Sequence, residues 1–344
     1  MSFKRRIINF SRQGFLICLE ILWFIAIRFV YKPDFVFLVY GDERHKRACW
    51  PKFVERIIGL LGLIGFLRFK SGYKRRRGLI LATTKSREEI ASNPHLALDI
   101  VSEVERRFPK AVIALAGQFP GWIVNASKAP PCEPCVTGMF GTCYTVLNSV
   151  REAIVDCLPD RQDGKIWKDV VVAVVGGAGH TGSEVVKLLA REERVGCVIA
   201  LDPRYKSDER VGKVWKTGDS TVLSQAGIAV ILTGKGDDAK AAVEQLRHGV
   251  VVLDDTHPMI GREMIESLRT KLAGVYKITS QGAERGLQYM PGLPDFKQGD
   301  IPGCLLEALV VSVFGRDSLV NYGVFEQRAR SLGITPKLGR HPRF

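Results

Sequence analysis

The sequence contains few cysteines for its length, eight among 344 residues. Domains that depend on disulfides carry a much denser pattern, so this chain is not a disulfide scaffold and we expect a reducing compartment, the cytoplasm. Cys132 and Cys135 are spaced like zinc ligands, but a zinc site needs four ligands and only Cys143 lies nearby, so no metal is expected. Because 46% of the residues are apolar, the composition also excludes disorder and collagen.

Long uninterrupted apolar segments are also missing, which excludes a polytopic membrane protein. The longest candidate, residues 14–31, is only just long enough to span a bilayer and contains Glu20 and Arg28. Each charge near the bilayer centre costs roughly 2.5–3.5 kcal/mol. No small-residue cleavage pattern follows, so we expect the segment to be retained. A helix lying in the membrane interface is favoured over a spanning one, which predicts peripheral rather than single-pass attachment.

The positive charge is concentrated near the N-terminus. The chain has 50 Lys and Arg against 36 Asp and Glu, a net charge of +14. Residues 1–77 hold 17 of the basic and five of the acidic residues, which leaves residues 78–344 nearly neutral and argues against a nucleic-acid partner. The apolar stretch 57–67 and the basic run 74–77 favour a segment bound to an anionic membrane surface. A buried core helix beside a solvated charge run is the alternative.

The region after the basic run has the pattern of an α/β domain. Apolar runs at 78–84 and 111–117 predict strands, and residues 86–108 have the apolar spacing of one helix face. A strand, a helix and a strand in this order predict a parallel sheet. Residues 119–142 are rich in Pro, Gly, Thr and Cys and predict a loop that lines a site. A helix is expected over 144–158.

A glycine-rich turn follows the next predicted strand, residues 169–175, and precedes a predicted helix. Its glycines fit the pattern G-x-G-x-x-G, which provides a tight turn, close backbone approach to a pyrophosphate and helix amides directed at the anion. The residues assigned to this dinucleotide loop are Gly177, Ala178, Gly179, His180, Thr181 and Gly182.

The ends of the following strands supply the rest of the predicted cofactor site. Asp202 ends the strand 197–201, and its carboxylate is suited to the ribose 2′-hydroxyl of NAD. Arg204 lies just beyond and is suited to the 2′-phosphate of NADP, so the cofactor is NAD or NADP. Thr233 and Gly234 follow another strand and are expected to edge the nicotinamide.

These patterns predict an α/β protein of two domains, a Rossmann domain with a doubly wound parallel sheet and a smaller N-terminal α/β substrate domain. The expected boundary lies at 159–164. The predicted parts are a membrane-associating segment (1–33), the substrate domain (34–160) with its basic apolar segment (53–77), the NAD(P)-binding domain (161–300) and C-terminal helices that pack back on the substrate domain (301–344).

The ordered set of segments resembles the acyl carrier protein reductases that form long-chain fatty aldehydes and, more distantly, the shikimate dehydrogenases. The matching segments are 35–40, 78–84, 115–119, 136–138, 142–145, 174–183, 253–258 and 304–308. The resemblance implies that a cysteine thiolate takes an acyl group from the carrier and that NADPH reduces the thioester. It further implies acyl carrier protein as a partner, an apolar small-molecule substrate, and Thr137, Gly138 and Thr142 as a substrate loop.

Two routes to catalysis follow from the residues. The family's cysteine position is occupied by Val250 here, which leaves Cys143 as a displaced nucleophile or as a small packing residue. Direct hydride transfer to a carbonyl instead needs a proton donor, and His257 beside Asp254 is the best-placed general acid.

We therefore expect a membrane-associated NAD(P)-dependent oxidoreductase that reduces a long-chain acyl thioester or aldehyde at a membrane surface. Two alternatives stay open. One is a dehydrogenase of a small polar hydroxy or carbonyl compound, and the other is a non-catalytic NAD(P)-binding protein that associates with membranes.

Overall fold

The computed structural model describes residues 31–41, 43, 59–157, 169–282, 286–290 and 297–340. The chain divides into two compact units. Unit 1 comprises Met1–Thr137, Glu284–Gly299 and Ala308–Asp317, and unit 2 comprises Gly138–Ala283, Asp300–Glu307 and Ser318–Phe344. The expected domain boundary at 159–164 and nearly all of the segment 1–33 lie outside the described residues. Within the described ranges, no helix combines the length and the apolar character needed to cross a membrane.

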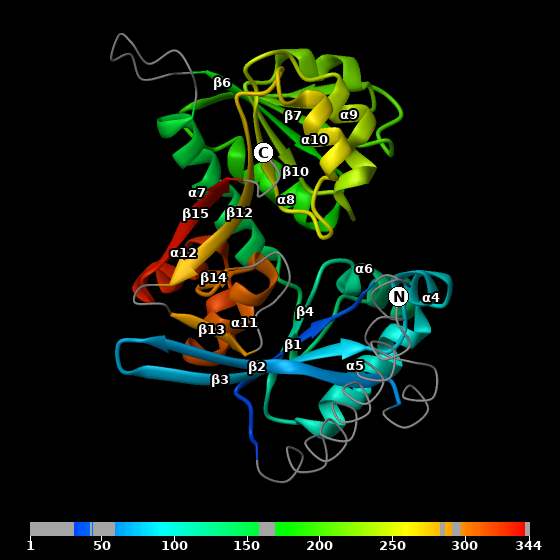
Figure 1. The fold of residues 1–344 in the computed structure, drawn as a ribbon, viewed down its shortest axis with the longest axis vertical. Helices are drawn as coiled ribbons and strands as arrows, with labels where there is room; N and C mark the ends of the chain where they lie inside the picture. Colours follow the sequence, from blue (N-terminus) through cyan, green and yellow to red (C-terminus); the bar gives the residue numbers. More distant parts are fainter. Residues whose placement is uncertain are drawn as a thin grey trace, which may run out of the picture. The chain divides into compact units, whose positions relative to one another are not determined.

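Unit 1 is built on a six-stranded sheet in the order β13-β2-β3-β1-β4-β5 (Figure 1). Strands β3, β1, β4 and β5 are parallel, β2 runs antiparallel to β3, and β13 runs antiparallel to β2. The strands are β1 (Phe35–Val39), β2 (Leu61–Ser71), β3 (Lys74–Thr83), β4 (Val112–Leu115), β5 (Cys135–Val136) and β13 (Leu287–Met290). The helices between them are α4 (Arg87–Ser92), α5 (His95–Arg107) and α6 (Phe119–Ser127).

Helices and sheet of unit 1 bury a common apolar core. Val36 and Leu38 of β1 share one cluster with Ile100 and Val104 of α5. These α5 residues recur at helical spacing, so a single face of the helix meets the sheet. The result confirms the strand, helix and strand predicted after the basic run.

Two segments of unit 1 differ from expectation. Residues 61–67 of the apolar stretch 57–67 belong to β2, where they pair with β3 and are largely buried in the sheet, so they form a strand and not the core helix of the alternative. The expected loop at 119–142 contains α6. Pro120 is compatible with the first turn of this helix, and the rings of Phe119 and Trp122 pack against Tyr40.

Unit 2 contains a nine-stranded sheet in the order β14-β12-β11-β10-β6-β7-β9-β8, with β15 also paired to β12. Its strands are β6 (Val170–Val175), β7 (Val195–Leu201), β8 (Glu209–Val211), β9 (Val214–Thr217), β10 (Ile228–Ile231), β11 (Val251–Asp254), β12 (Gly274–Gly282), β14 (Asp300–Ile301) and β15 (Ile334–Arg340). Its α-helices are α7 (Met139–Asp156), α8 (His180–Leu189), α9 (Lys240–Glu244), α10 (Arg262–Leu268) and α12 (Tyr322–Ser331), while α11 (Gly303–Phe314) contributes residues to both units.

The strand order in unit 2 reverses at β6. The chain continues through β7 and β9 on one side of β6 and through β10, β11 and β12 on the other, and these strands are all parallel. This is the doubly wound Rossmann arrangement, which binds ligands beyond the carboxyl ends of the strands at the point of reversal. The predicted α/β fold class is confirmed.

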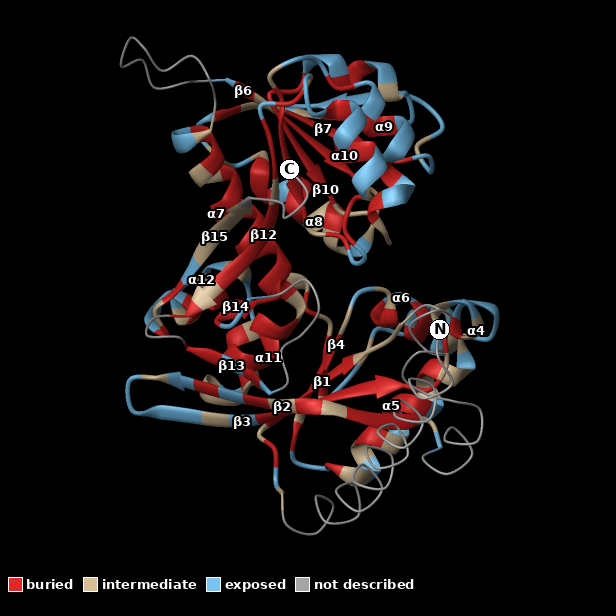
Figure 2. Ribbon diagram, in the orientation of Figure 1, coloured by how far each residue is buried: buried red, intermediate tan, exposed pale blue. Residues whose placement is uncertain are grey.

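Apolar layers cover both faces of this sheet. Helices α7 and α8 pack on one face, and α9, α10 and the short helix η1 (Ser220–Gln225) pack on the other. The central strands are buried along nearly their whole length (Figure 2). Continuous apolar strands are typical of a parallel sheet covered on both faces, and they explain why the sequence predicted these strands correctly.

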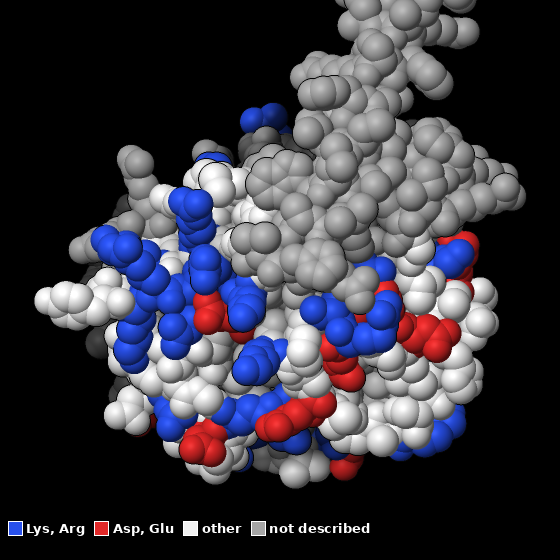
Figure 3. Space-filling view, turned by 90° about the horizontal axis from the view of Figure 1, so that it is seen from below, with Lys and Arg blue, Asp and Glu red and all other residues white. Residues whose placement is uncertain are grey.

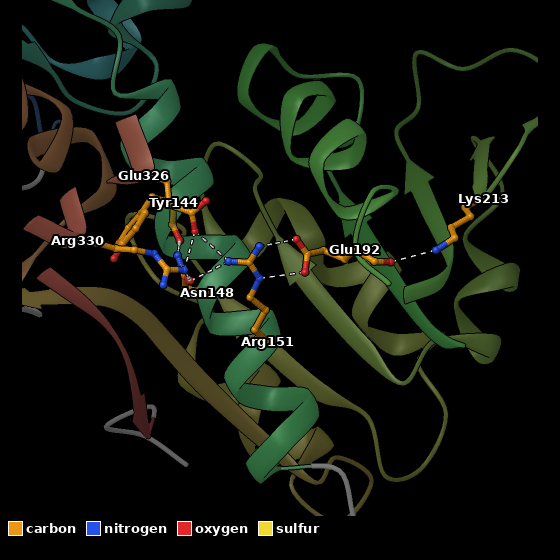
Figure 4. A network of polar contacts seen from close by, with 7 residues as sticks. All are labelled: Tyr144, Asn148, Arg151, Glu192, Lys213, Glu326 and Arg330. Atoms are coloured by element: carbon orange, nitrogen blue, oxygen red, sulfur yellow. Dashed lines mark hydrogen bonds and ion pairs between the residues drawn. The ribbon is translucent and has the colours of Figure 1, made fainter. Parts of the chain in front are cut away.

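Helix α7 is also tied to its neighbours by a polar network (Figure 4). Arg151 binds Glu192 with two hydrogen bonds of 2.9 and 2.5 Å and binds Glu326 of α12 with one of 3.0 Å. Arg330 binds the same Glu326 oxygen at 2.8 Å. The guanidinium of Arg151 therefore links α7 to the segment after α8 and to α12.

Candidate nucleotide-binding site

The chain leaves β6 through a turn that only glycines fit. Gly176 has φ +94°, a left-handed conformation that favours glycine. A Cβ on Gly177 would lie 2.9 Å from the Cβ of Ala200, and a Cβ on Gly182 would lie 2.1 Å from the carbonyl oxygen of Gly176. Helix α8 thus approaches the loop backbone as closely as a pyrophosphate-binding turn requires.

Helix α8 begins directly at this turn. Gly179 is its N-cap and makes no side-chain capping bond, and a Cβ there would lie 3.1 Å from the oxygen of Gly176. His180 is exposed and Thr181 is half-buried. A helix N-terminus that begins in a glycine loop presents backbone amides and a positive dipole end to an anion.

Asp202 follows β7 beside the glycine loop. Its carboxylate, 5% exposed, accepts hydrogen bonds from the amide of Ala178 at 3.2 Å and from Nε and Nη2 of Arg204, each at 2.8 Å. Burial alone would raise the pKa of this carboxyl, but the bonds from Arg204 and Ala178 hold it below its ordinary value. The loop, an ionised carboxylate and an arginine are thus brought together, as the sequence predicted.

The ends of four neighbouring strands lie at the same level of the sheet. Val175 of β6 pairs with Ile231 of β10, which pairs with Asp254 of β11, which pairs with Lys277 of β12. Three strand spacings correspond to about 14 Å. The glycine loop and the polar groups after β11 therefore share one edge, as a dinucleotide site at this edge requires.

Thr233 and Gly234 lie on this edge after β10. The backbone nitrogen of Thr233 would be 3.5 Å from a Cβ on Gly176, so the turn borders the glycine loop. The hydroxyl of Thr233 donates to the carbonyl of Lys235 at 2.7 Å. This bond stabilises the local turn.

Asp254 organises the loop that carries His257. It is fully buried and accepts hydrogen bonds from the amide of Thr256 at 2.8 Å, from the hydroxyl of Thr256 at 2.6 Å and from the amide of Ile260 at 3.0 Å. These bonds fix residues 254–260, so Asp254 is a positioning residue.

Lys277 is a functional candidate that the sequence analysis missed. Its side chain is buried on β12, and its Nζ donates to the carbonyl of Thr256 at 2.9 Å and lies 3.1 Å from Nε2 of His257. A single lysine in an apolar strand gives no local signal, because its partner belongs to the loop after the neighbouring strand.

Burial and the charge of Lys277 both shift the pKa values of His257 and Asp255. Desolvation by the surrounding protein and then the ammonium of Lys277 lower the pKa of His257 well below its usual value. The ring of His257 keeps exposed surface, so the ammonium 3.1 Å away is the firmer of the two causes. His257 is therefore neutral at pH 7. Desolvation raises the pKa of Asp255 to about 7, with Lys277 opposing the rise and Asp254 adding to it.

Cys143 lies in the apolar core of unit 2. Its side chain is fully buried in α7, and burial raises the pKa of the thiol far above its ordinary value. Because the thiolate is the nucleophilic form, we assign Cys143 to packing and not to catalysis. Val250 is equally buried. Among the described residues, no group of three or more His, Cys, Asp or Glu side chains is arranged to hold a metal.

The residues expected to form a substrate loop begin a helix. A Cβ on Gly138 would lie 2.5 Å from the Cα of Cys304, and a Cβ on Gly303 would lie 2.6 Å from the Cα of Thr142. Glu307 accepts hydrogen bonds from the amides of Gly138 at 3.1 Å and Phe140 at 2.7 Å. Gly138 and Thr142 therefore mark a close helix contact. Thr137 is half-buried and belongs to unit 1.

Comparison with known proteins gives matches among solved structures alone. No family model and no curated protein matches the sequence. An NAD-complexed D-isomer specific 2-hydroxyacid dehydrogenase from Lactobacillus delbrueckii ssp. bulgaricus matches with 13% identity and a TM-score of 0.32, covering 70% of this chain and 78% of that one. D-Lactate dehydrogenase with NAD+ from Lactobacillus jensenii matches with 12% identity and a TM-score of 0.33, and the match covers 70% of this chain and 77% of that one. NAD+-bound 3-phosphoglycerate dehydrogenase from Entamoeba histolytica matches with 13% identity and a TM-score of 0.33, and the match covers 70% of this chain and 79% of that one.

These matches correct the resemblance drawn from the sequence. The three structures named above are a D-isomer specific 2-hydroxyacid dehydrogenase, a D-lactate dehydrogenase and a 3-phosphoglycerate dehydrogenase, and none of these three is an acyl carrier protein reductase or a shikimate dehydrogenase. The assignment to the acyl carrier protein reductases is therefore wrong. The segments that suggested it are the strands and the glycine turn that many Rossmann dehydrogenases have in common.

Proposed function

We propose that the protein is an NAD(H)-dependent oxidoreductase that interconverts a hydroxyl and a carbonyl group of a small polar compound. One observation carries the proposal: a glycine loop with an ionised Asp202 and a polar cluster of Asp255, His257 and Lys277 share one edge of the sheet of unit 2. A buried ammonium suits a polar substrate oxygen better than it suits an acyl chain.

The residues of the loop fit the nucleotide. A Cβ on Gly177 or Gly182 would collide with neighbouring residues of the protein, so the turn is tight and brings the start of α8 close to the loop. The amides at the start of α8 suit a pyrophosphate. Asp202 is placed to accept a hydrogen bond from a ribose hydroxyl, and its negative charge disfavours a 2′-phosphate. We therefore propose NAD(H) in preference to NADP(H).

The polar cluster handles the proton that accompanies hydride transfer. The bound nicotinamide supplies or accepts the hydride. Lys277 holds a proton on Nζ, and neutral His257 accepts from it at Nε2. In the reducing direction this pair delivers a proton to the carbonyl oxygen, and in the oxidising direction it receives the proton of the hydroxyl. Asp255, with its pKa at about 7, exchanges protons with solvent near neutrality.

Nucleotide binding is tested first, by titrating purified protein with NADH and following the cofactor fluorescence. Gly182→Ala places a methyl group 2.1 Å from the oxygen of Gly176, so we expect at least a tenfold loss of affinity, equivalent to about 1.4 kcal/mol. Gly121→Ala is the matched control, because a Cβ there meets nothing within 4 Å. Absence of NADH binding to the unmodified protein would refute the proposed function.

Turnover is tested with a set of small 2-oxo acids and other polar carbonyl compounds. Lys277→Met and His257→Gln are expected to lower kcat by about a hundredfold or more, the usual contribution of a general acid, while NADH affinity stays unchanged. Nucleotide binding without turnover of any of these compounds would instead favour the non-catalytic NAD-binding alternative.

A further inference from the structure

The hairpin of β2 and β3 extends beyond the other strands of the unit 1 sheet (Figure 1). β1 pairs with residues 78–82 of β3, and β13 pairs with residues 66–69 of β2. In the part of the chain that the structure describes, residues 71–76 form strand pairs only within the hairpin. At its base, the amide of Lys70 donates to the carbonyl of Gly286 at 2.7 Å and the amide of Asp34 donates to the carbonyl of Arg77 at 2.8 Å. Its turn is exposed (Figure 2), and Tyr73 at that turn is fully exposed.

One face of this hairpin carries four basic side chains. Arg68 lies opposite Arg77 and Lys70 lies opposite Arg75, and all four are exposed. Like charges placed directly opposite each other destabilise a sheet. None of the four forms an ion pair with a described carboxylate. Asp34 accepts a hydrogen bond from the backbone amide of Arg77 at 2.8 Å.

The other face of the hairpin is anchored to unit 1. Phe69 is buried there, opposite Arg76. Nε of Arg76 donates to the carbonyl of Ser312 at 2.7 Å, and Nζ of Lys74 lies 3.7 Å from the centre of the Phe314 ring. Because these contacts orient the ribbon, Arg68, Lys70, Arg75 and Arg77 are held on the face turned away from α11.

We propose that this basic face, with Tyr73 at its tip, docks on the headgroups of an anionic phospholipid membrane. Each Lys or Arg held near such a surface contributes about a fivefold factor to binding, and a ribbon presents several at one level. Tyrosine is enriched where apolar and aqueous regions meet. Figure 3 shows lysine and arginine side chains gathered on this side of unit 1.

The charge of the whole chain favours lipid over nucleic acid. The excess of 12 positive charges belongs to residues 1–77, and the apolar stretch 14–31 precedes the hairpin in the same segment. Basic and apolar residues that follow one another suit a lipid surface. A surface that binds nucleic acid would need further basic residues in the nearly neutral part of the chain, residues 78–344. This inference is independent of the reaction proposed above.

The test is sedimentation of the full chain with vesicles of phosphatidylcholine, with and without phosphatidylglycerol, at low and high salt. We expect binding that requires the anionic lipid and weakens with salt. The quadruple variant Arg68→Gln, Lys70→Gln, Arg75→Gln and Arg77→Gln is expected to lose more than a hundredfold in partitioning, since four factors of about five multiply.

Two control variants distinguish the effect of the basic face of the hairpin from the effect of the net charge of the protein. A quadruple variant of exposed cations in unit 2, Arg191→Gln, Arg194→Gln, Lys240→Gln and Arg269→Gln, is expected to bind as the unmodified chain does. Arg68→Lys, Arg75→Lys and Arg77→Lys together retain the charge and should retain binding. The proposal is overturned if the hairpin variant still binds anionic vesicles, if binding ignores lipid charge, or if the basic face instead binds duplex DNA and no vesicle.

Discussion

Among single residues, Arg204 bears most directly on the proposed choice of nucleotide. Both oxygens of the Asp202 carboxylate accept hydrogen bonds from its guanidinium, yet 63% of the Arg204 side chain is exposed to solvent. A ribose hydroxyl would therefore compete with this exposed guanidinium for the carboxylate of Asp202. The same guanidinium is the group that would attract a 2′-phosphate.

Replacing this arginine is expected to sharpen the preference for NADH. Arg204→Ala frees Asp202 and removes the cation, so the ratio of NADH to NADPH affinity should rise about tenfold, equivalent to one charged hydrogen bond of about 1.4 kcal/mol. Fluorescence titration with both nucleotides measures the ratio. A lower ratio in the variant would show that Arg204 supports NADH binding.

Asp255 leads to a prediction on pH. Because its pKa is about 7, the carboxyl is mostly protonated below pH 7 and mostly ionised above it. Carbonyl reduction consumes a proton, so kcat/KM for reduction should fall as pH rises through about 7. In Asp255→Asn this break should disappear. An unchanged pH profile in the variant would assign the break to another group.

The sequence indicates the candidate nucleotide loop more directly than the candidate proton-handling groups. Gly177, Gly179 and Gly182 act through their own backbone, so a local motif reveals them. Lys277 lies on β12, whereas His257 follows the neighbouring strand β11. In the sequence, Lys277 is only one polar residue in an apolar strand. Cys143 looked reactive because burial in α7 is not visible in a short pattern of Gly and Thr.

At the scale of elements, α7 depends on a polar network as well as on its apolar face. Arg151 hydrogen-bonds Glu192 and Glu326, and the bonds to Glu192 come first among the causes that raise the pKa of its guanidinium. About a third of the Arg151 side chain is exposed, so solvent screens part of the attraction.

Removing this guanidinium should therefore have a moderate effect. Arg151→Ala is expected to lower the free energy of unfolding by roughly 1–2 kcal/mol, as measured by urea denaturation. Arg191→Ala, an exposed arginine near the same helix layer, serves as the control and should change stability by less than about 0.5 kcal/mol. Equal losses in both variants would contradict the role given to the network.

The elements also show where sequence patterns fail. β6 was predicted because both of its faces are buried and its residues are continuously apolar. β2 was misjudged because its glycine-containing apolar run has no strict alternation. Its partner β13 lies more than 200 residues further along the chain, so no local signal marks the pairing.

For the whole molecule, the two units are discontinuous in sequence. Unit 1 takes its last residues from Ala308–Asp317, and α11 supplies residues 303–307 to unit 2 and 308–314 to unit 1. The predicted parts were consecutive blocks of sequence, because composition reveals linkers but gives no sign of a chain that returns to an earlier unit.

A fragment of residues 34–160 is therefore not expected to fold by itself. It lacks β13, which pairs with β2, and the residues of α11 that bind Arg76. It also exposes the apolar face of α7. Circular dichroism should show no cooperative thermal transition for this fragment, in contrast to the full chain. A cooperative transition would mean that residues 34–160 form an autonomous domain.

The interleaving of the units has a consequence for biosynthesis. Unit 1 includes residues up to Asp317 and unit 2 includes β15 (Ile334–Arg340), so both units need segments that are synthesised after residue 300. Neither sheet can be finished while most of the polypeptide is still emerging. The edge of β2 and the apolar strands of unit 2 therefore stay exposed until these later segments have emerged, which favours the binding of chaperones to the nascent chain.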